Sequence, residues 1–421
     1  MPRTMLDDTQ TLPPANAGRL TLRVTAAAER RVRFGHPWLY AEAIRKARHQ
    51  GRPGDLAALY DRRGRFLALG LYDPGSPIRV RILQRLRQAV IDQSWFAARL
   101  REAIQLRAPL ARTGTTGYRL VHGENDGLPG LVIDRYGTTL VMKLYTAAWV
   151  PHLRAVLEAL GTVWPAERLI LRLARTVQAQ GRGLSGLTDG LRLAGPACAG
   201  SLVFEEHGAR FEVDPVHGQK TGFFLDQRDN RAQVEALAQG RSVLDAFAYT
   251  GAFSVRAARG GARQVLSVDA SAPALEAAVR NMRRNRQDRA VAAAGHDTLL
   301  GDAFDVLQRL REERRRFDLV ILDPPAFAST QALVPRAEAA YGRLTRLGLA
   351  VLARGGLLMA SSCSSHVSAE RFFAVVHDAA RRSGCRLREL ARTGHPVDHP
   401  VRFPEGAYLK ALFAEVVATK G

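Results

Sequence analysis

The sequence predicts an α/β protein whose C-terminal half is a Rossmann-like, doubly wound domain. From about residue 211, apolar runs alternate with helical stretches, as in βαβ units of a mostly parallel sheet. Residues 19–90 indicate short strands between turns, which is typical of a small β-barrel. The 421 residues suffice for two to three domains. We therefore expect a flexible tail over 1–18, a barrel over 19–90, a central α+β domain over 91–210 and the Rossmann-like domain over 211–421.

The barrel is predicted from short alternating strands. Asp73-Pro74-Gly75-Ser76-Pro77 is a strong turn signal. After it, residues 78–83 alternate with period two, so Arg79 and Arg81 share a face that we expect to point outward. The expected strands are Leu20–Val24, Leu56–Tyr60, Phe66–Gly70 and Ile78–Leu83.

The two later domains follow from longer patterns. In the central domain, a helical period extends from about Asp92 to Arg112, residues 118–134 hold a polar loop between two strands, and residues 181–200 are expected to form a flexible loop. In the C-terminal domain, the expected helices are Phe253–Arg259, Ala272–Arg286 and Leu344–Leu352. The expected strands are Ser242–Phe247, Gln264–Asp269, Leu299–Gly301, Leu319–Leu322, Gly356–Ser361 and Leu409–Val417.

The charge favours a polyanionic partner, with nucleic acid the foremost candidate. The formal net charge is +21. Residues 19–90 alone carry 16 basic and five acidic side chains, so an RNA-facing surface is expected there. The excess of arginine over lysine can reflect nucleotide composition, but that bias does not explain why acids fail to balance bases.

Several classes of protein are disfavoured. No run approaches the roughly 18 apolar residues of a membrane helix, and the start lacks the apolar core of a signal peptide. Three cysteines are too few for a disulfide framework, and none has zinc-site spacing, so we expect no metal and a cytoplasmic location.

Three predicted strand ends are suited to a nucleoside-containing cofactor. Residues 243–254 form a strand, a tight loop and a helix start, and backbone amides in such a loop bind polar cofactor ends. Asp269 ends the next strand and can accept hydrogen bonds from ribose hydroxyls. Asp302 and the amide of Ala303 follow the third strand and could hold adenine. This ordered set favours S-adenosylmethionine; the alternative is an ordinary doubly wound domain whose acids cap helices.

The fourth and fifth strand ends predict the chemistry. Asp323-Pro324-Pro325-Ala326-Phe327 offers a carboxylate and rigid carbonyls that can read the amino edge of a base. Cys363 follows the fifth strand, and parallel strands bring their carboxyl ends to one edge. Thiolate addition at cytosine carbon 6 makes carbon 5 nucleophilic enough to take a methyl group. The alternative for residues 323–327 is a rigid turn, and the alternative for Cys363 is a packed, unreactive cysteine. The packed role is what we expect of Cys198 and Cys385.

One polar segment, residues 217–231, precedes the first strand of the C-terminal sheet. It is too polar and too glycine-marked to be simple core, and it leads into an apolar-periodic helix. We interpret it as a cofactor or substrate lid, with a capped helix entry as the alternative.

At these residues the chain resembles the bacterial 23S ribosomal RNA large-subunit methyltransferase I family, cytosine-carbon-5 enzymes that use S-adenosylmethionine. Residues 33–38 and 54–55 are similar to that family's N-terminal RNA-binding PUA domain, 118–137 and 205–208 to its central domain, and 217–231, 244–251, 323–325 and 362–364 to its methyltransferase motifs. The resemblance implies that Cys363 is the nucleophile and that Asp323 positions the base. It implies cofactor contacts from Gln227, Arg228, Asp245, Phe247, Thr250, Gly251, Asp269, Asp302, Ala303 and Asp323.

The chain differs from the family pattern at two points, and two alternative functions stay open. Ala326 stands where relatives commonly carry Lys, and no second cysteine follows Asp323, so the group that removes the carbon-5 proton is unidentified. The chain could instead be an exocyclic-amine methyltransferase that uses Asp323-Pro324-Pro325, or a non-catalytic RNA-binding or ribosome-assembly factor that retains S-adenosylmethionine. The expected partner is ribosomal RNA, 23S above all, with no membrane; the PUA and central domains also offer surfaces for a homodimer.

Overall fold

A computed structural model of the chain describes residues 12, 18–47, 50–179, 181, 184, 186–198 and 200–418. The chain divides into two compact units. Unit 1 contains residues up to 207 together with 213–225 and 397–403, and unit 2 contains 208–212, 226–396 and the residues from 404 onward. Except for Leu12 and Gly18, the tail expected over 1–18 lies outside the described residues. The domain boundaries expected at 90 and 210 stay predictions.

The N-terminal sheet of unit 1 has six strands in the order β2-β6-β5-β4-β1-β3. Only β1 and β4 pair in parallel; the other neighbouring strands are antiparallel. Thr25 caps the helix α1, which buries Ala28 and Val32 against the core of this sheet. The elements are β1 (Arg19–Val24), α1 (Ala26–Arg33), β2 (Trp38–Tyr40), β3 (Ile44–Ala47), β4 (Leu56–Tyr60), β5 (Phe66–Tyr72) and β6 (Ile78–Arg85).

Arg81 corrects the expected outward face of β6. Its side chain is buried, and one guanidinium nitrogen donates to the carbonyl of Ile78. Burial lowers the pKa of Arg81, whereas the nearby carboxylates of Glu124 and Asp73 raise it. A period-two pattern fixes which residues share a face, but it does not say which face the rest of the unit covers.

A second sheet in unit 1 has the order β11-β10-β9-β8-β7. Asp92 caps the helix expected near that residue, and Trp149 lies fully buried in the core. The expected loop over 181–200 is wrong in part, because β11 lies within it and pairs with β10. The elements are α2 (Gln93–Ala111), β7 (Gly117–His122), β8 (Leu131–Tyr136), β9 (Thr139–Leu144), α3 (Leu153–Val163), β10 (Arg168–Leu173), α4 (Arg175–Gln178) and β11 (Arg192–Ala194). The next two strands are β12 (Leu202–Glu206) and β13 (Ala209–Val213).

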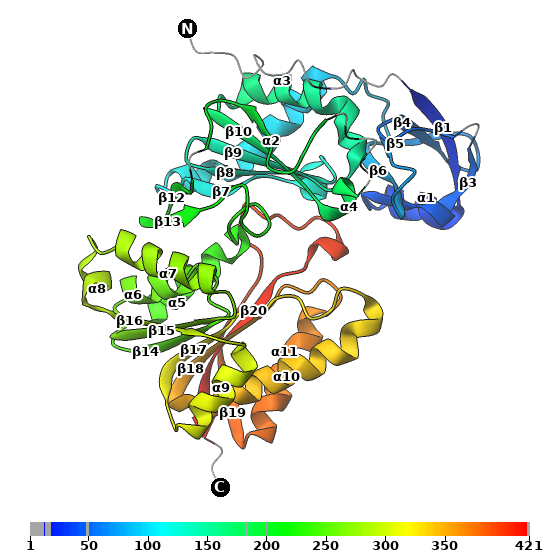
Figure 1. The fold of residues 1–421 in the computed structure, drawn as a ribbon. Coiled ribbons are helices and arrows are strands. Elements are labelled where there is room, and N and C mark those ends of the chain that lie inside the picture. Colours follow the sequence, from blue (N-terminus) through cyan, green and yellow to red (C-terminus); the bar gives the residue numbers. More distant parts are fainter. Residues whose placement is uncertain are drawn as a thin grey trace. The chain divides into compact units, whose positions relative to one another are not determined.

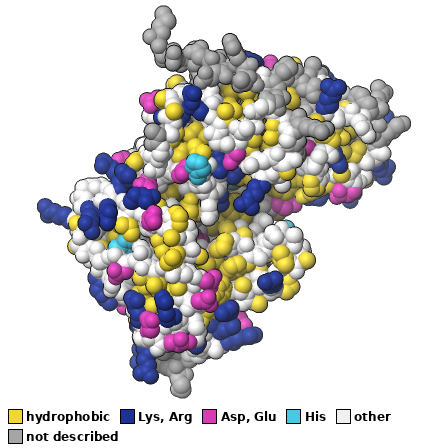
Figure 2. All heavy atoms as spheres, in the orientation of Figure 1, with side chains coloured by type: hydrophobic (Ala, Val, Ile, Leu, Met, Phe, Trp, Pro, Cys, Tyr) yellow, Lys and Arg dark blue, Asp and Glu magenta, His cyan; other side chains and the backbone are white. Residues whose placement is uncertain are grey.

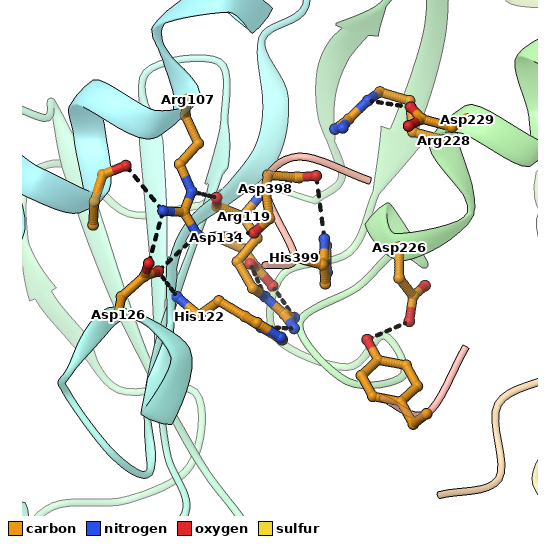
Figure 3. Close-up of polar contacts among 12 residues, drawn as sticks. Arg107, Arg119, His122, Asp126, Asp134, Asp226, Arg228, Asp229, Asp398 and His399 are labelled. Carbon is orange, nitrogen blue, oxygen red and sulfur yellow. Dashed lines mark hydrogen bonds and ion pairs between the residues drawn. The ribbon is translucent and has the colours of Figure 1, made fainter. Parts of the chain in front are cut away.

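Residues 397–403, here called the strap, belong to unit 1 although they come late in the chain. The guanidinium of Arg107 forms two hydrogen bonds with Asp126, at 3.0 and 2.6 Å, and donates a third to the carbonyl of Asp398 (Figure 3). The amide of Arg119 donates to the Asp398 carboxylate at 2.9 Å. A buried guanidinium needs such a full set of acceptors, so this network holds the strap in place.

Unit 2 is a doubly wound sheet with the strand order β16-β15-β14-β17-β18-β20-β19. The first five strands in this order are parallel, and β20 is antiparallel to both of its neighbours. Figure 1 shows helices on both sides of the sheet, with α6 and α7 on one side and α10 and α11 on the other. The strands are β14 (Ser242–Ala246), β15 (Gln264–Asp269), β16 (Gly295–Leu300), β17 (Phe317–Leu322), β18 (Leu352–Ser362), β19 (Cys385–Thr393) and β20 (Lys410–Ala418). The helices are α5 (Arg228–Leu237), α6 (Ala252–Arg259), α7 (Ala272–Arg284), α8 (Arg289–Ala293), α9 (Ala303–Glu312), α10 (Val334–Ala350) and α11 (Ala369–Arg382).

The six expected strands of this domain are all present, with ends shifted by a few residues. Two features differ from the expectation. The helix expected over 344–352 begins at Val334 and ends at Ala350, and the edge strand β19 was not expected. β19 carries several charged, exposed residues, which hide the apolar signal of a strand.

The surface agrees with the basic composition. On the face drawn in Figure 2, Lys and Arg side chains are scattered widely among the other side chains. Among the residues that the structure describes, no helix combines the length and apolar character needed to cross a bilayer.

Candidate active site

The candidate site follows from the strand order of unit 2. β14 lies between β15 and β17, so the chain winds in opposite directions on the two sides of β14. In open α/β sheets such a switch point leaves a crevice at the carboxyl ends of the strands, where ligands bind. Asp269, Asp323 and Cys363 end or directly follow β15, β17 and β18. Asp245 lies one residue before the end of β14.

The loop after β14 has an unusual backbone. Phe247, Tyr249 and Gly251 have φ angles of 68°, 48° and 73°. Such angles cost non-glycine residues about 1–3 kcal/mol and cluster at ligand sites. A Cβ atom on Gly251 would lie 2.6 Å from the Cβ atom of Ala278, so this position requires glycine. The loop is held by Asp269, which accepts a hydrogen bond of 2.8 Å from the amide of Tyr249.

Asp245 is a buried carboxylate with unfilled hydrogen-bonding capacity. Ser254 donates to its Oδ2 atom at 2.6 Å, while its Oδ1 atom has no partner among the described residues. Burial raises the pKa of Asp245 to about 7, and the carboxylates of Asp323 and Asp269 add to the effect. The buried hydroxyl of Thr250 likewise has no partner in the described part of the chain. These atoms fit a cofactor that carries a positive charge and hydroxyl groups.

Asp302 has the role that the alternative hypothesis predicts, because it caps a helix. Its carboxylate accepts hydrogen bonds from the amides of Phe304 at 2.9 Å and Asp305 at 3.4 Å, and therefore caps α9. Ala303 is buried at the start of that helix. Contacts of Asp302 and Ala303 with the cofactor stay predictions.

Asp323 is fixed from two sides. The side-chain amide of Gln227 donates to its Oδ1 atom at 2.7 Å, and the hydroxyl of Ser361 donates to the same atom. Gln227 is itself held by Asn230. The structure thus brings Gln227 to the candidate catalytic carboxylate, whereas Arg228 is buried at the start of α5, 3.4 Å from the Asp229 carboxylate (Figure 3). The lid interpretation of residues 217–231 stays a prediction.

Cys363 lies at the strand end next to that of Asp323. β17 and β18 pair Leu322 with Ala360, so Asp323 faces Ser361, two residues before the thiol. Cys363 is half-buried. Burial raises the pKa of Tyr341, whose hydroxyl accepts a 2.8 Å hydrogen bond from Ser362, and the charges of Cys363 and Asp323 contribute to the increase. A thiol, a carboxylate and a tyrosine hydroxyl therefore share this part of the edge.

The other two cysteines lie elsewhere. Cys385 begins the edge strand β19, and burial raises the pKa of its thiol. The thiol of Cys198 donates to the carbonyl of Gly200. Neither residue belongs to the carboxyl edge formed by β14, β17 and β18.

Several residues of the edge were not expected from the sequence. Ser254 and Ser361 donate hydrogen bonds to the predicted residues Asp245 and Asp323. Tyr341 accepts a hydrogen bond from Ser362, and Lys410 at the start of β20 lies opposite the same residue. Spacing could not identify them, because their roles depend on which strands and helices are neighbours.

Comparison with known proteins agrees with this fold. A family model described as S-adenosylmethionine-dependent methyltransferase matches residues 131–414, and a PUA-like domain model matches residues 22–85. A solved structure from Streptococcus mutans, described as a SAM-dependent methyltransferase, aligns with a TM-score of 0.80 at 23% identity, covering 94% of this chain and 100% of that chain. The structure of SMU.776 complexed with SAH gives the same values. The fold and the site thus define a methyltransferase that uses S-adenosylmethionine.

Curated relatives identify the family within this class of methyltransferases. The ribosomal RNA large subunit methyltransferase of Deinococcus radiodurans is 49% identical over 96% of this chain and 99% of that protein. The ribosomal RNA large subunit methyltransferase I of Pseudoalteromonas translucida is 36% identical over 93% of this chain and 98% of that protein. The chain belongs to the ribosomal RNA large subunit methyltransferase I family.

Proposed function

We propose that this enzyme forms 5-methylcytosine in the 23S ribosomal RNA of the large subunit through a covalent adduct of Cys363. The observation that carries the proposal is the pairing of β17 with β18, which brings Asp323 and Cys363 to one edge of a methyltransferase sheet. A methyltransferase that acts on an exocyclic amine needs no thiol at this position. Carbon-5 methylation does, because carbon 5 of cytosine is a poor nucleophile.

Each residue has a distinct part in the proposed reaction. The Cys363 thiolate forms a bond to carbon 6, which raises electron density at carbon 5. Asp323, oriented by Gln227 and Ser361, gives a proton from its protonated form to the ring nitrogen of the base and accepts a hydrogen bond from the amino group, which favours the addition. The bound cofactor supplies the methyl group. A base then takes the proton from carbon 5, and the electron pair of that bond restores the ring double bond and expels Cys363 from carbon 6 as the thiolate.

The cofactor is proposed to lie at the ends of β14 and β15. Asp245 and Thr250 each offer a buried oxygen atom that has no hydrogen-bond partner in the described chain. Phe247 and Gly251 shape the loop, and Asp269 holds it. Asp302 and Ala303 would contribute from the start of α9.

One experiment tests the proposed product. Ribosomal RNA isolated with and without the active enzyme is digested and mapped by mass spectrometry, and a single cytosine is expected to gain a methyl group at carbon 5. A methyl group on the exocyclic amine would reject the proposal in favour of the amine-methylating alternative. Absence of any methyl incorporation into RNA would favour a non-catalytic, cofactor-binding assembly factor.

RNA binding is proposed to involve the end of α1. Phe34 is 89% exposed and directly follows the exposed, basic last turn of this helix. Exposed aromatic rings beside arginines stack on unpaired bases. We expect Phe34→Ala to weaken binding of a ribosomal RNA fragment about tenfold, in line with the loss of one stacked base. Fluorescence anisotropy measures this, with Val90→Ala as a control because Val90 is also exposed on unit 1; equal affinities would contradict the prediction.

The cellular location and the oligomeric state of the enzyme are also proposed. A cytoplasmic location follows from the proposed ribosomal substrate. A homodimer stays a prediction, and light scattering of the purified protein tests it directly.

A further inference from the structure

Lys410, the first residue of β20, is a buried cation beside the proposed nucleophile. Lys410 is only 3% exposed. In the pairing of β20 with β18, it lies opposite Ser362, the last residue of β18. Burying an ammonium group is costly unless its donors are satisfied. A lysine kept at such a position therefore calls for a structural or chemical reason.

The ammonium group is satisfied by main-chain oxygen atoms around the thiol. It donates to the carbonyls of Ser364, of Val367 at 2.6 Å and of Tyr408 at 3.0 Å. The first two carbonyls belong to the loop that follows Cys363, so Lys410 ties this loop to β20. An ammonium group has three N–H donors, and these three bonds use all of them. In this state it has no lone pair with which to take up a proton.

Few charged groups act on this ammonium group. Burial lowers the pKa of Lys410 to about 8, while the negative charges of Cys363 and Glu370 raise it. Glu370 is exposed at the start of α11, so water screens its charge, whereas Cys363 is half-buried. Two further titratable groups lie at this edge of the sheet: Asp323, which directly follows β17, and Tyr341 of α10.

We propose that Lys410 is a positioning residue that fixes the loop after β18 and holds Cys363 as the thiolate. The inference rests on the proposed function, because the thiolate is the form that adds to carbon 6. A neighbouring cation lowers the pKa of a cysteine thiol and so increases the fraction of the reactive form near neutral pH. The main-chain bonds keep this cation in place through the reaction.

The titration of the Cys363 thiol tests the inference. Full-length protein with Cys198→Ser and Cys385→Ser is alkylated with iodoacetamide between about pH 6 and pH 10, and modification of Cys363 is followed by mass spectrometry. Lys410→Met removes the charge, and Lys410→Arg retains it. We expect the midpoint to rise by about one pH unit or more in Lys410→Met, as expected for loss of a nearby opposite charge. Lys410→Arg should titrate close to the parent protein.

Two results would overturn the inference. One is an unchanged midpoint of thiol alkylation in a Lys410→Met variant that still binds S-adenosylmethionine. The other needs no variant of Lys410: a parent midpoint at or above about 8.5, the value of an unperturbed thiol, excludes stabilisation of the thiolate. The titration uses neither RNA nor methyl transfer, so a failed methylation mechanism and a failed role for Lys410 give different results.

Discussion

Cys363→Ala is expected to lower methyl transfer to ribosomal RNA by at least about 10³-fold, the order seen when an enzyme loses its nucleophile. Without the thiolate no bond forms at carbon 6, and carbon 5 stays too poor a nucleophile to accept a methyl group. Binding of S-adenosylmethionine should remain at the level of the parent protein, because Cys363 lies at the end of β18, away from the loop that follows β14. Transfer of a radioactive methyl group measures the first effect, and calorimetry measures the second.

One further variant and one modified RNA test the same role of Cys363. Cys385→Ala removes a half-buried thiol from the edge strand β19 and should leave methyl transfer intact. RNA with 5-fluorocytosine at the target should become covalently attached to the parent protein at Cys363, because fluorine at carbon 5 prevents the proton loss that releases the thiol. Methyl transfer by Cys363→Ala at more than about a tenth of the parent rate would be incompatible with a nucleophilic role.

The strand ends could be predicted from the sequence because a local pattern determines them. An apolar run followed by Asp or Cys predicts a buried strand and a polar group at its end, and parallel strands bring those groups together. Asp269, Asp323 and Cys363 follow this logic. Asp302 shows its limit, because an acid after a strand can equally cap the next helix, as it does in α9.

The contacts that support the site could not be predicted, because they join residues that are distant in sequence. Lys410 begins an apolar strand, and a sequence pattern would assign its amine to solvent; the pairing of β20 with β18 buries it instead. Gln227 reaches Asp323 across 96 positions of the chain. The strap carries no periodic pattern, and its membership of unit 1 depends on Arg107 and Asp126.

Binding of S-adenosylmethionine is expected to depend on pH through Asp245. The ordinary pKa of 3.8 is raised to about 7 by burial, so without cofactor the carboxyl is largely protonated at pH 6. A group with a raised carboxyl pKa contributes to stability below its unfolded pKa, and this contribution is lost as the pH rises through about 7. A positively charged cofactor has the opposite preference, because it favours the carboxylate. Its affinity should therefore fall by up to about tenfold per pH unit below pH 7 and become level above it.

The same linkage predicts that binding near pH 6 releases about one proton, which calorimetry in buffers of different ionisation enthalpy measures. Asp245→Asn removes both the charge and the titration. We expect it to weaken binding by up to about a hundredfold at pH 8, a typical cost for a buried charge partner, and to abolish the pH dependence. Asp378→Asn, at a half-exposed position on α11, should leave both properties unchanged. If the parent protein bound the cofactor equally well at pH 6 and pH 8 without releasing a proton, Asp245 could not be the carboxylate that meets the positive charge of the cofactor.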